Sequence, residues 1–100
     1  GSTSVYNNSD ITASEFSLSQ NFPNPFNPVT AIKYNVPSKA YVMMKVYNSI
    51  GKEIVELVNE VKTGGTYEVK FDASNLPSGV YYYKLTSGNF SETKKMILIK

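Results

Sequence analysis

The chain of 100 residues contains no cysteine and no histidine, and it also lacks tryptophan. Without cysteine it forms neither a disulfide nor a thiolate metal site, so its stability depends on core packing and hydrogen bonds. Without histidine it cannot carry Ser-His-Asp or Cys-His catalysis or a histidine-based zinc site. These absences point away from enzymes and toward a structural or recognition protein that needs no cofactor and no metal.

The net charge is small and the apolar runs are short. All ten basic residues are lysines, and the formal net charge is only +2. Nucleic-acid-binding domains carry clustered, arginine-rich positive surfaces, so we expect no nucleic-acid partner. No apolar run approaches the roughly 20 residues of a membrane-spanning helix, and none has the character of a signal-peptide core.

The sequence is rich instead in residues that favour β-strands. Eight tyrosines and five phenylalanines accompany many valines and isoleucines, and such side chains are enriched in sheets. One hundred residues suffice for one domain with its own core. Residues 1–14 are polar and lack periodicity, so we expect a linker there, beginning with a Gly1-Ser2 cloning remnant, and a folded domain over residues 15–100.

Alternation of apolar and polar residues predicts about seven short strands separated by turns, which favours an all-β, Ig-like Greek-key sandwich. Residues 53–58 also fit one face of a helix, but their valines favour a strand. Four of the other segments have a clear inward face. Their expected core residues are Ile32, Tyr34 and Val36; Val42, Met44 and Val46; Tyr67, Val69 and Phe71; and Tyr81, Tyr83 and Leu85.

Three of the five prolines lie in one stretch, here called the proline segment: Asn21-Phe22-Pro23-Asn24-Pro25-Phe26-Asn27-Pro28. Proline lacks an N–H donor and restricts the residue before it, which excludes a helix and a central strand. We therefore expect a stiff, extended segment that crosses a sheet edge and inserts Phe22 or Phe26 into the core.

Residues 76–81 have the pattern of a tyrosine corner. In Greek-key sandwiches such a tyrosine, here Tyr81, bonds through its hydroxyl to a nearby backbone group. Gly79 lies two residues before it, after the turn at Pro77.

The last strand, residues 90–100, is apolar on both faces near its end. Lys94 and Lys95 precede the run Met96-Ile97-Leu98-Ile99, and Lys100 follows it. One interpretation is that the lysines protect an edge strand from aggregation. The other is that a partner recognises this end by adding a strand to the sheet.

Polar and aromatic side chains elsewhere give weaker evidence for a metal site or a sugar-binding surface. Asp72 and Asn75 bracket a turn, which favours an Asx-turn over a calcium site. Tyr41, Tyr47 and Tyr82 lie on expected outward faces, where tyrosine rings can stack on sugars, although cross-strand packing is the commoner reason for such residues. No group of residues suggests catalysis.

Taken in order, several motifs resemble one known family. The stretch Leu18-Ser19-Gln20 leads into the proline segment, and it is followed by Thr30-x-Ile32-x-Tyr34, Val46-Tyr47-Asn48-x-x-Gly51, Gly79-Val80-Tyr81 and Thr93-Lys94-Lys95-Met96-Ile97-Leu98. Over most of the chain these motifs resemble the type A C-terminal sorting domain of the type IX secretion system, also called the Por secretion system C-terminal domain.

The resemblance implies a non-catalytic Ig-like sandwich at the end of an exported cargo protein, which passes through the periplasm to the cell surface or the medium. The implied partners are an outer-membrane translocon or shuttle protein, a surface sortase that removes the domain in many members, and the upstream cargo domain in the same chain. The implied recognition residues are Pro23, Asn24, Pro25, Phe26, Asn27, Pro28, Gly79, Tyr81, Lys94, Lys95, Met96, Ile97, Leu98, Ile99 and Lys100.

The alternative is an accessory Ig-like binding or spacer module attached to an extracellular enzyme. Such a module would bind carbohydrate through its tyrosines, or act as an assembly scaffold like the Ig-like domain of flagellar hook-capping proteins, which shares the proline segment. We expect a monomer, with a terminal strand that can pair with a second copy in a crystal.

Overall fold

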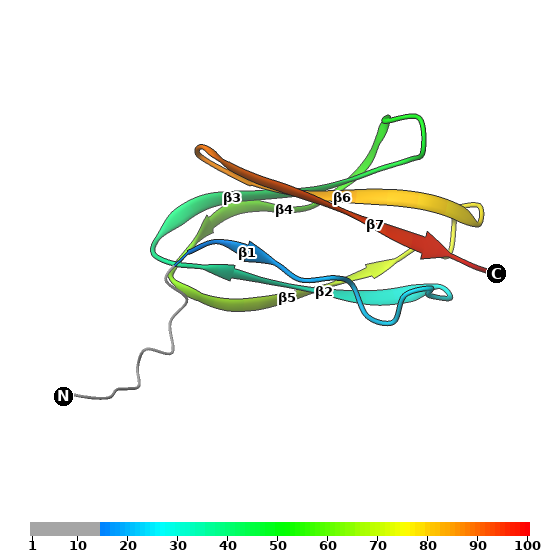
Figure 1. The fold of residues 1–100 in the computed structure, drawn as a ribbon, viewed down its shortest axis with the longest axis horizontal. Helices are drawn as coiled ribbons and strands as arrows, with labels where there is room; N and C mark the ends of the chain where they lie inside the picture. Colours follow the sequence, from blue (N-terminus) through cyan, green and yellow to red (C-terminus); the bar gives the residue numbers. More distant parts are fainter. Residues whose placement is uncertain (1–14) are drawn as a thin grey trace.

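The computed structural model describes residues 15–100, and the predicted linker lies outside this part. Seven strands form two sheets that face each other as a sandwich (Figure 1). The first sheet has the order β1-β2-β5, with β1 at Ser17–Leu18, β2 at Val29–Val36 and β5 at Gly65–Asp72. The second has the order β4-β3-β6-β7, with β3 at Ala40–Tyr47, β4 at Glu53–Lys62, β6 at Gly79–Ser87 and β7 at Phe90–Leu98.

All paired strands are antiparallel, and their arrangement is Ig-like. Ig constant domains pair strands A, B, E and D in one sheet and C, F and G in the other. Here the fourth strand pairs with the third instead, so the sheets correspond to ABE and DCFG. The predicted seven-stranded all-β sandwich is confirmed, and the ambiguous residues 53–58 form part of strand β4. No helix in the described residues is long and apolar enough to cross a membrane.

The predicted inward faces form the core between the two sheets. On β2, β3 and β6 every expected core residue is buried, and Phe71 of β5 is only 4% exposed. Tyr67 and Val69 are half-buried, because β5 is an edge strand and the opposite sheet covers them only in part. Tyr67 instead stacks on Tyr34 at 5.5 Å between ring centroids.

The tyrosine corner is present at the start of β6. The Tyr81 hydroxyl donates a hydrogen bond to the Pro77 carbonyl at 2.6 Å, which fixes the loop from β5 of one sheet to β6 of the other. Tyr83 follows two residues later, at the position where antibody domains place a disulfide cysteine, and it is fully buried.

Candidate functional site

The proline segment bridges the two sheets. Phe22 pairs with Ala31 of β2 through two backbone hydrogen bonds of 2.9 Å. Farther along, the Phe26 N–H donates to the Ile97 carbonyl and the Ile99 N–H donates to the Phe26 carbonyl, both at 2.9 Å. All three X-Pro bonds of the segment are cis. The segment therefore runs across the open side of the sandwich between β2 and β7 (Figure 1), as the proline pattern predicts.

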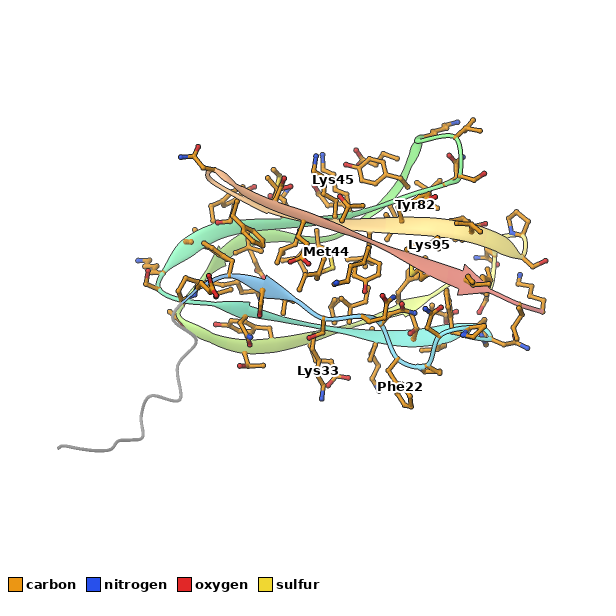
Figure 2. All side chains as sticks on the ribbon, in the orientation of Figure 1. Phe22, Lys33, Met44, Lys45, Tyr82 and Lys95 are labelled. Carbon is orange, nitrogen blue, oxygen red and sulfur yellow. The ribbon has the colours of Figure 1, made fainter. Side chains whose placement is uncertain are left out.

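The two phenylalanines of this segment face opposite environments. Phe26 is 1% exposed and contacts Phe71, with 6.0 Å between the ring centroids. Phe22 is 79% exposed and points away from the sandwich (Figure 2). Phe26 is thus the core residue and Phe22 a surface residue, which resolves the choice that the sequence left open.

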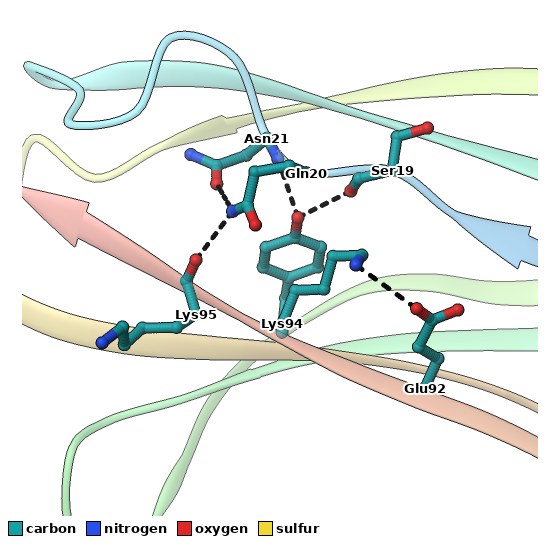
Figure 3. Close-up of polar contacts among 7 residues, drawn as sticks. Ser19, Gln20, Asn21, Glu92, Lys94 and Lys95 are labelled. Carbon is teal, nitrogen blue, oxygen red and sulfur yellow. Dashed lines mark hydrogen bonds and ion pairs between the residues drawn. The ribbon is translucent and has the colours of Figure 1, made fainter.

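One side chain of the segment and one just before it cover more of the edge of β7, the last strand of its sheet. The Asn24 side-chain oxygen Oδ1 accepts a hydrogen bond from the Ile97 N–H at 3.0 Å. The Gln20 amide Nε2 donates to the Lys95 carbonyl at 2.7 Å (Figure 3). Together with the Phe26 bonds, these contacts occupy outward backbone groups of β7 near its end. A partner strand could add there only by displacing the proline segment.

A buried polar cluster fixes the start of the segment. Asn21 is 2% exposed, and its amide Nδ2 donates to the Pro23 carbonyl at 3.1 Å and to the Thr30 hydroxyl oxygen at 3.0 Å. The Thr30 hydroxyl in turn donates to the Pro23 carbonyl at 2.8 Å. Because buried polar groups are costly when unpaired, these bonds hold the backbone in one path.

Tyr83 anchors the same region from the opposite sheet. Its hydroxyl donates to the Ser19 carbonyl at 2.7 Å and accepts from the Asn21 N–H at 2.8 Å (Figure 3). Burial raises the pKa of Tyr83 to about 12, although the bond from Asn21 acts in the opposite direction. Tyr83 therefore joins β6 to the chain that leads into the proline segment.

Three sequence motifs meet at the end of β7. Leu98 lies opposite Gly79 of β6 on one side and opposite Phe26 on the other. Gly79 has a φ of +152°, a conformation that residues with a side chain rarely adopt. Lys100 reaches the Ser74 carbonyl through its Nζ at 2.8 Å. The proline segment, the tyrosine corner and the chain end are thus parts of one structure, here called the junction.

The implied recognition residues differ in exposure, and therefore in whether a partner can contact their side chains. Phe26, Tyr81, Met96 and Leu98 are buried, so their side chains support the junction from within. Pro28, Lys94 and Ile97 are half-buried. The exposed members are Pro23, Asn24, Pro25, Asn27, Gly79, Lys95, Ile99 and Lys100.

Two exposed apolar residues extend this surface beyond the implied set. Phe22 and Val29, which is 41% exposed, line a hollow of about 190 Å³ with Pro23. Sequence reasoning missed Val29 because alternation along a strand does not show that the proline segment folds back beside it, where Phe22 pairs with Ala31.

The two adjacent lysines of β7 point to opposite faces. Lys94 lies opposite Tyr83, on the face toward the other sheet, and pairs with Glu92 at 3.3 Å (Figure 3). Inward charges at the rim of a sheet discourage edge-to-edge pairing. Lys95 lies opposite Tyr82, on the outer face. Only Lys95 of the two is exposed.

Asp72 forms the predicted Asx-turn. Its Oδ1 accepts hydrogen bonds from the Ser74 N–H at 3.0 Å and from the Ser74 hydroxyl. These bonds hold the pKa of Asp72 below its ordinary value. Among residues 15–100, no group of His, Cys, Asp and Glu side chains could hold a metal ion.

The fold and the junction define a class of protein: an Ig-like domain whose own proline segment covers its edge strand β7. Residues 20–100 match the family described as the secretion system C-terminal sorting domain. The chain belongs to this family. It is a non-catalytic sorting domain that directs the secretion of a cargo protein across the outer membrane by the type IX system, and it acts through the secretion machinery.

Two solved structures share the fold, both from Porphyromonas gingivalis. One is dimeric latent PorU, with a TM-score of 0.67 and 18% identity over 87% of this chain. The other is PorZ, an essential surface component of the type IX secretion system, with a TM-score of 0.57 and 21% identity over 89% of this chain. The chain spans about a tenth of the length of each, 10% and 12%. No curated protein matches its sequence.

Proposed function

We propose that an outer-membrane component of the type IX machinery recognises the domain at the junction. One observation carries this proposal: Leu98 lies between Gly79 and Phe26, so motifs from three distant parts of the chain form one surface. A receptor that reads this surface distinguishes the folded domain from an unfolded one, because the motifs are adjacent only after folding.

The partner docks on the side chains of the junction and leaves the sheet edge in place. The outward backbone groups at Ile97 and Ile99 are already bonded to the proline segment, which disfavours strand addition at that stretch. Phe22, at 79% exposure, Ile99, at 50%, and Val29, at 41%, are the large apolar groups available for contact. A few residues in an interface supply most of its affinity, and they bind in well-packed pockets from which water is excluded.

The test is a reporter with a periplasmic signal, fused upstream of this domain and expressed in a host with a type IX system. We expect Phe22→Ala and Ile99→Ser to reduce surface delivery severalfold, measured by protease accessibility of the reporter on whole cells. The matched control is Val61→Ser, because Val61 is 53% exposed but lies on β4, the opposite edge of the sheet. Unchanged delivery by both junction variants would exclude the junction as the recognition surface.

A further variant separates docking from strand addition. Asn24→Ala removes the acceptor for the Ile97 N–H and so partly uncovers the edge of β7. Recognition of the intact junction predicts lower delivery, whereas recognition by strand addition predicts equal or higher delivery. Melting of the purified variant shows whether the fold is kept.

We also propose the two remaining partners that the resemblance implies: an upstream cargo domain in the same chain and a surface sortase that cuts before the folded domain. Glu15 and Phe16 mark the start of the described structure, so cleavage N-terminal to them leaves the sandwich intact. Mass spectrometry of the released domain tests this. A fragment that begins within β2 or later would contradict it.

A further inference from the structure

The outer face of the four-stranded sheet carries a cluster of aromatic and basic side chains, here called the Tyr–Lys face. It consists of Tyr47, Tyr82, Lys45, Lys84 and Lys95. Tyr47 lies directly opposite Tyr82, which lies opposite Lys95, and Lys45 lies opposite Lys84 in the next row. Directly opposite residues of an antiparallel pair share a face. Figure 2 shows Lys45 on this side of the sandwich and Lys33 on the other.

Two lysines of this face lie directly opposite each other, although Lys45 also lies opposite Glu56 of β4. Like charges directly opposite each other on neighbouring strands are destabilising, and Lys45 and Lys84 are such a pair. Lys45 is compensated by Glu53 at 3.3 Å, and the hydrogen bond to that carboxylate raises the pKa of Lys45. Lys84 and Lys95 form no ion pair with any residue from 15 to 100. Positive charge is therefore uncompensated on the β6–β7 side of the face.

The tyrosines of this face differ from Tyr81 and Tyr83, two tyrosines of the core. The hydroxyls of Tyr81 and Tyr83 bond to backbone carbonyls. Tyr47 and Tyr82 are half-buried, and their hydroxyls make no hydrogen bond within residues 15–100. They offer partly exposed rings and unpaired hydroxyls on a regular surface.

We propose that the Tyr–Lys face binds an acidic polysaccharide. Sugar rings pack on Tyr47 and Tyr82, since an aromatic ring offers an apolar face and, in tyrosine, a polar group. Carboxylates of the polymer accept hydrogen bonds from Lys84 and Lys95. Neighbouring strands lie about 4.8 Å apart, close to the length of one sugar unit, so the row from Tyr47 to Lys95 matches roughly two units.

Other anionic partners fit the face less well. Nucleic-acid surfaces favour arginine, and the chain has none. Binding to an anionic membrane needs large apolar groups that insert among the lipids. The most exposed apolar side chains, Phe22 and Ile50, lie outside the face.

The test is isothermal titration of the purified chain with polygalacturonate oligomers at low salt. We expect Tyr82→Ala and Lys84→Gln each to weaken binding at least fivefold. The matched controls are Tyr41→Ala and Lys33→Gln, expected to change it less than twofold. Tyr41 is on the same face but six residues along β3 from Tyr47, roughly 20 Å away, and Lys33 lies on the other sheet. Thermal melts verify that each variant is folded.

Two further ligands determine whether the sugar itself is recognised. Neutral dextran is expected not to bind, and phosphatidylglycerol vesicles are expected to bind at least fivefold more weakly per anionic group than polygalacturonate. Absence of polygalacturonate binding, equal binding to the vesicles, or equal effects of Tyr82→Ala and Tyr41→Ala would overturn the proposal. The titration contains no secretion component, so its result is independent of the proposed recognition at the junction.

Discussion

At the scale of residues, Phe22 and Phe26 are the same side chain in opposite environments, 79% and 1% exposed. We expect Phe26→Ala to lower the free energy of unfolding by about 3 to 5 kcal/mol, because the core cannot refill the volume of the ring. Phe22→Ala serves as the control and should change it by roughly 0.5 kcal/mol or less. Urea denaturation followed by tyrosine fluorescence measures both. A loss below about 1 kcal/mol for Phe26→Ala would show that its ring is not part of the core.

Because of Tyr83, the free energy of unfolding should depend on pH in the alkaline range. Its pKa is about 12 in the folded protein and 10.0 as the unperturbed value, so the folded state holds the proton more tightly. The raised pKa of Tyr83 therefore stabilises the fold by on the order of 2 to 3 kcal/mol. This stabilisation is complete below pH 10 and is lost as the pH rises toward 12.

The comparison with Tyr83→Phe isolates this effect, because other groups with raised pKa values, such as Lys45, titrate in both proteins. The variant should lose less stability than the native chain between pH 9.5 and 11.5, measured by chemical denaturation at each pH. Parallel loss in both proteins would mean that Tyr83 ionises as readily in the folded state as in the unfolded one. At neutral pH the variant loses its bonds to Ser19 and Asn21, so only the slope is compared.

At the scale of elements, the two edges of the four-stranded sheet are protected by different means. The pairing of β4 with β3 shifts register at two places, and such bulges twist an edge strand away from new partners. The edge of β7 is instead covered by the proline segment. The inward Lys94, paired with Glu92, adds a charge at the rim.

Removal of this cover should expose β7. In the double variant Gln20→Ala and Asn24→Ala, the Lys95 carbonyl and the Ile97 N–H lose their side-chain partners. We expect faster hydrogen exchange at the Ile97 amide and a concentration-dependent dimer in sedimentation experiments. Asn59→Ala, on β4, is the matched control. A double variant that stays monomeric, with the native exchange rate at Ile97, would show that Phe26 alone closes the edge.

At the scale of the whole molecule, the last strand, β7, contributes to the core. Met96 and Leu98 are 0% and 1% exposed, and β7 pairs with β6 along its full length. Loss of each buried aliphatic side chain costs roughly 2 to 5 kcal/mol, against a total stability of about 5 to 15 kcal/mol for a domain.

Deletion of residues 94–100 should therefore abolish cooperative unfolding, as seen by near-ultraviolet circular dichroism on heating. Failure of such a truncated domain to be exported would report loss of the fold as well as loss of the junction. Retention of a cooperative transition close to that of the full chain would contradict this expectation. For this reason the point variants Phe22→Ala and Ile99→Ser are the sharper test of recognition.

The sequence by itself determined most of the strands, the inward faces of β2, β3 and β6, and the family. Alternation in a strand has a period of two, so Val42, Met44 and Val46 could be assigned to the core without the partner strands being known. The tyrosine corner was also predicted, because Tyr81 and Pro77 are close in the chain. Local geometry is sufficient for features of this kind.

The tertiary structure alone decided what covers β7 and which side chains meet there. Asn24 and Ile97 are 73 positions apart in the chain, and neither residue alone indicates the other. Likewise, only the strand register shows that Lys94 faces inward while Lys95 joins Tyr82 on the outer face. The physical reason is that alternation defines which residues of one strand share a face, whereas the identity of their neighbours depends on how the sheets pair and pack.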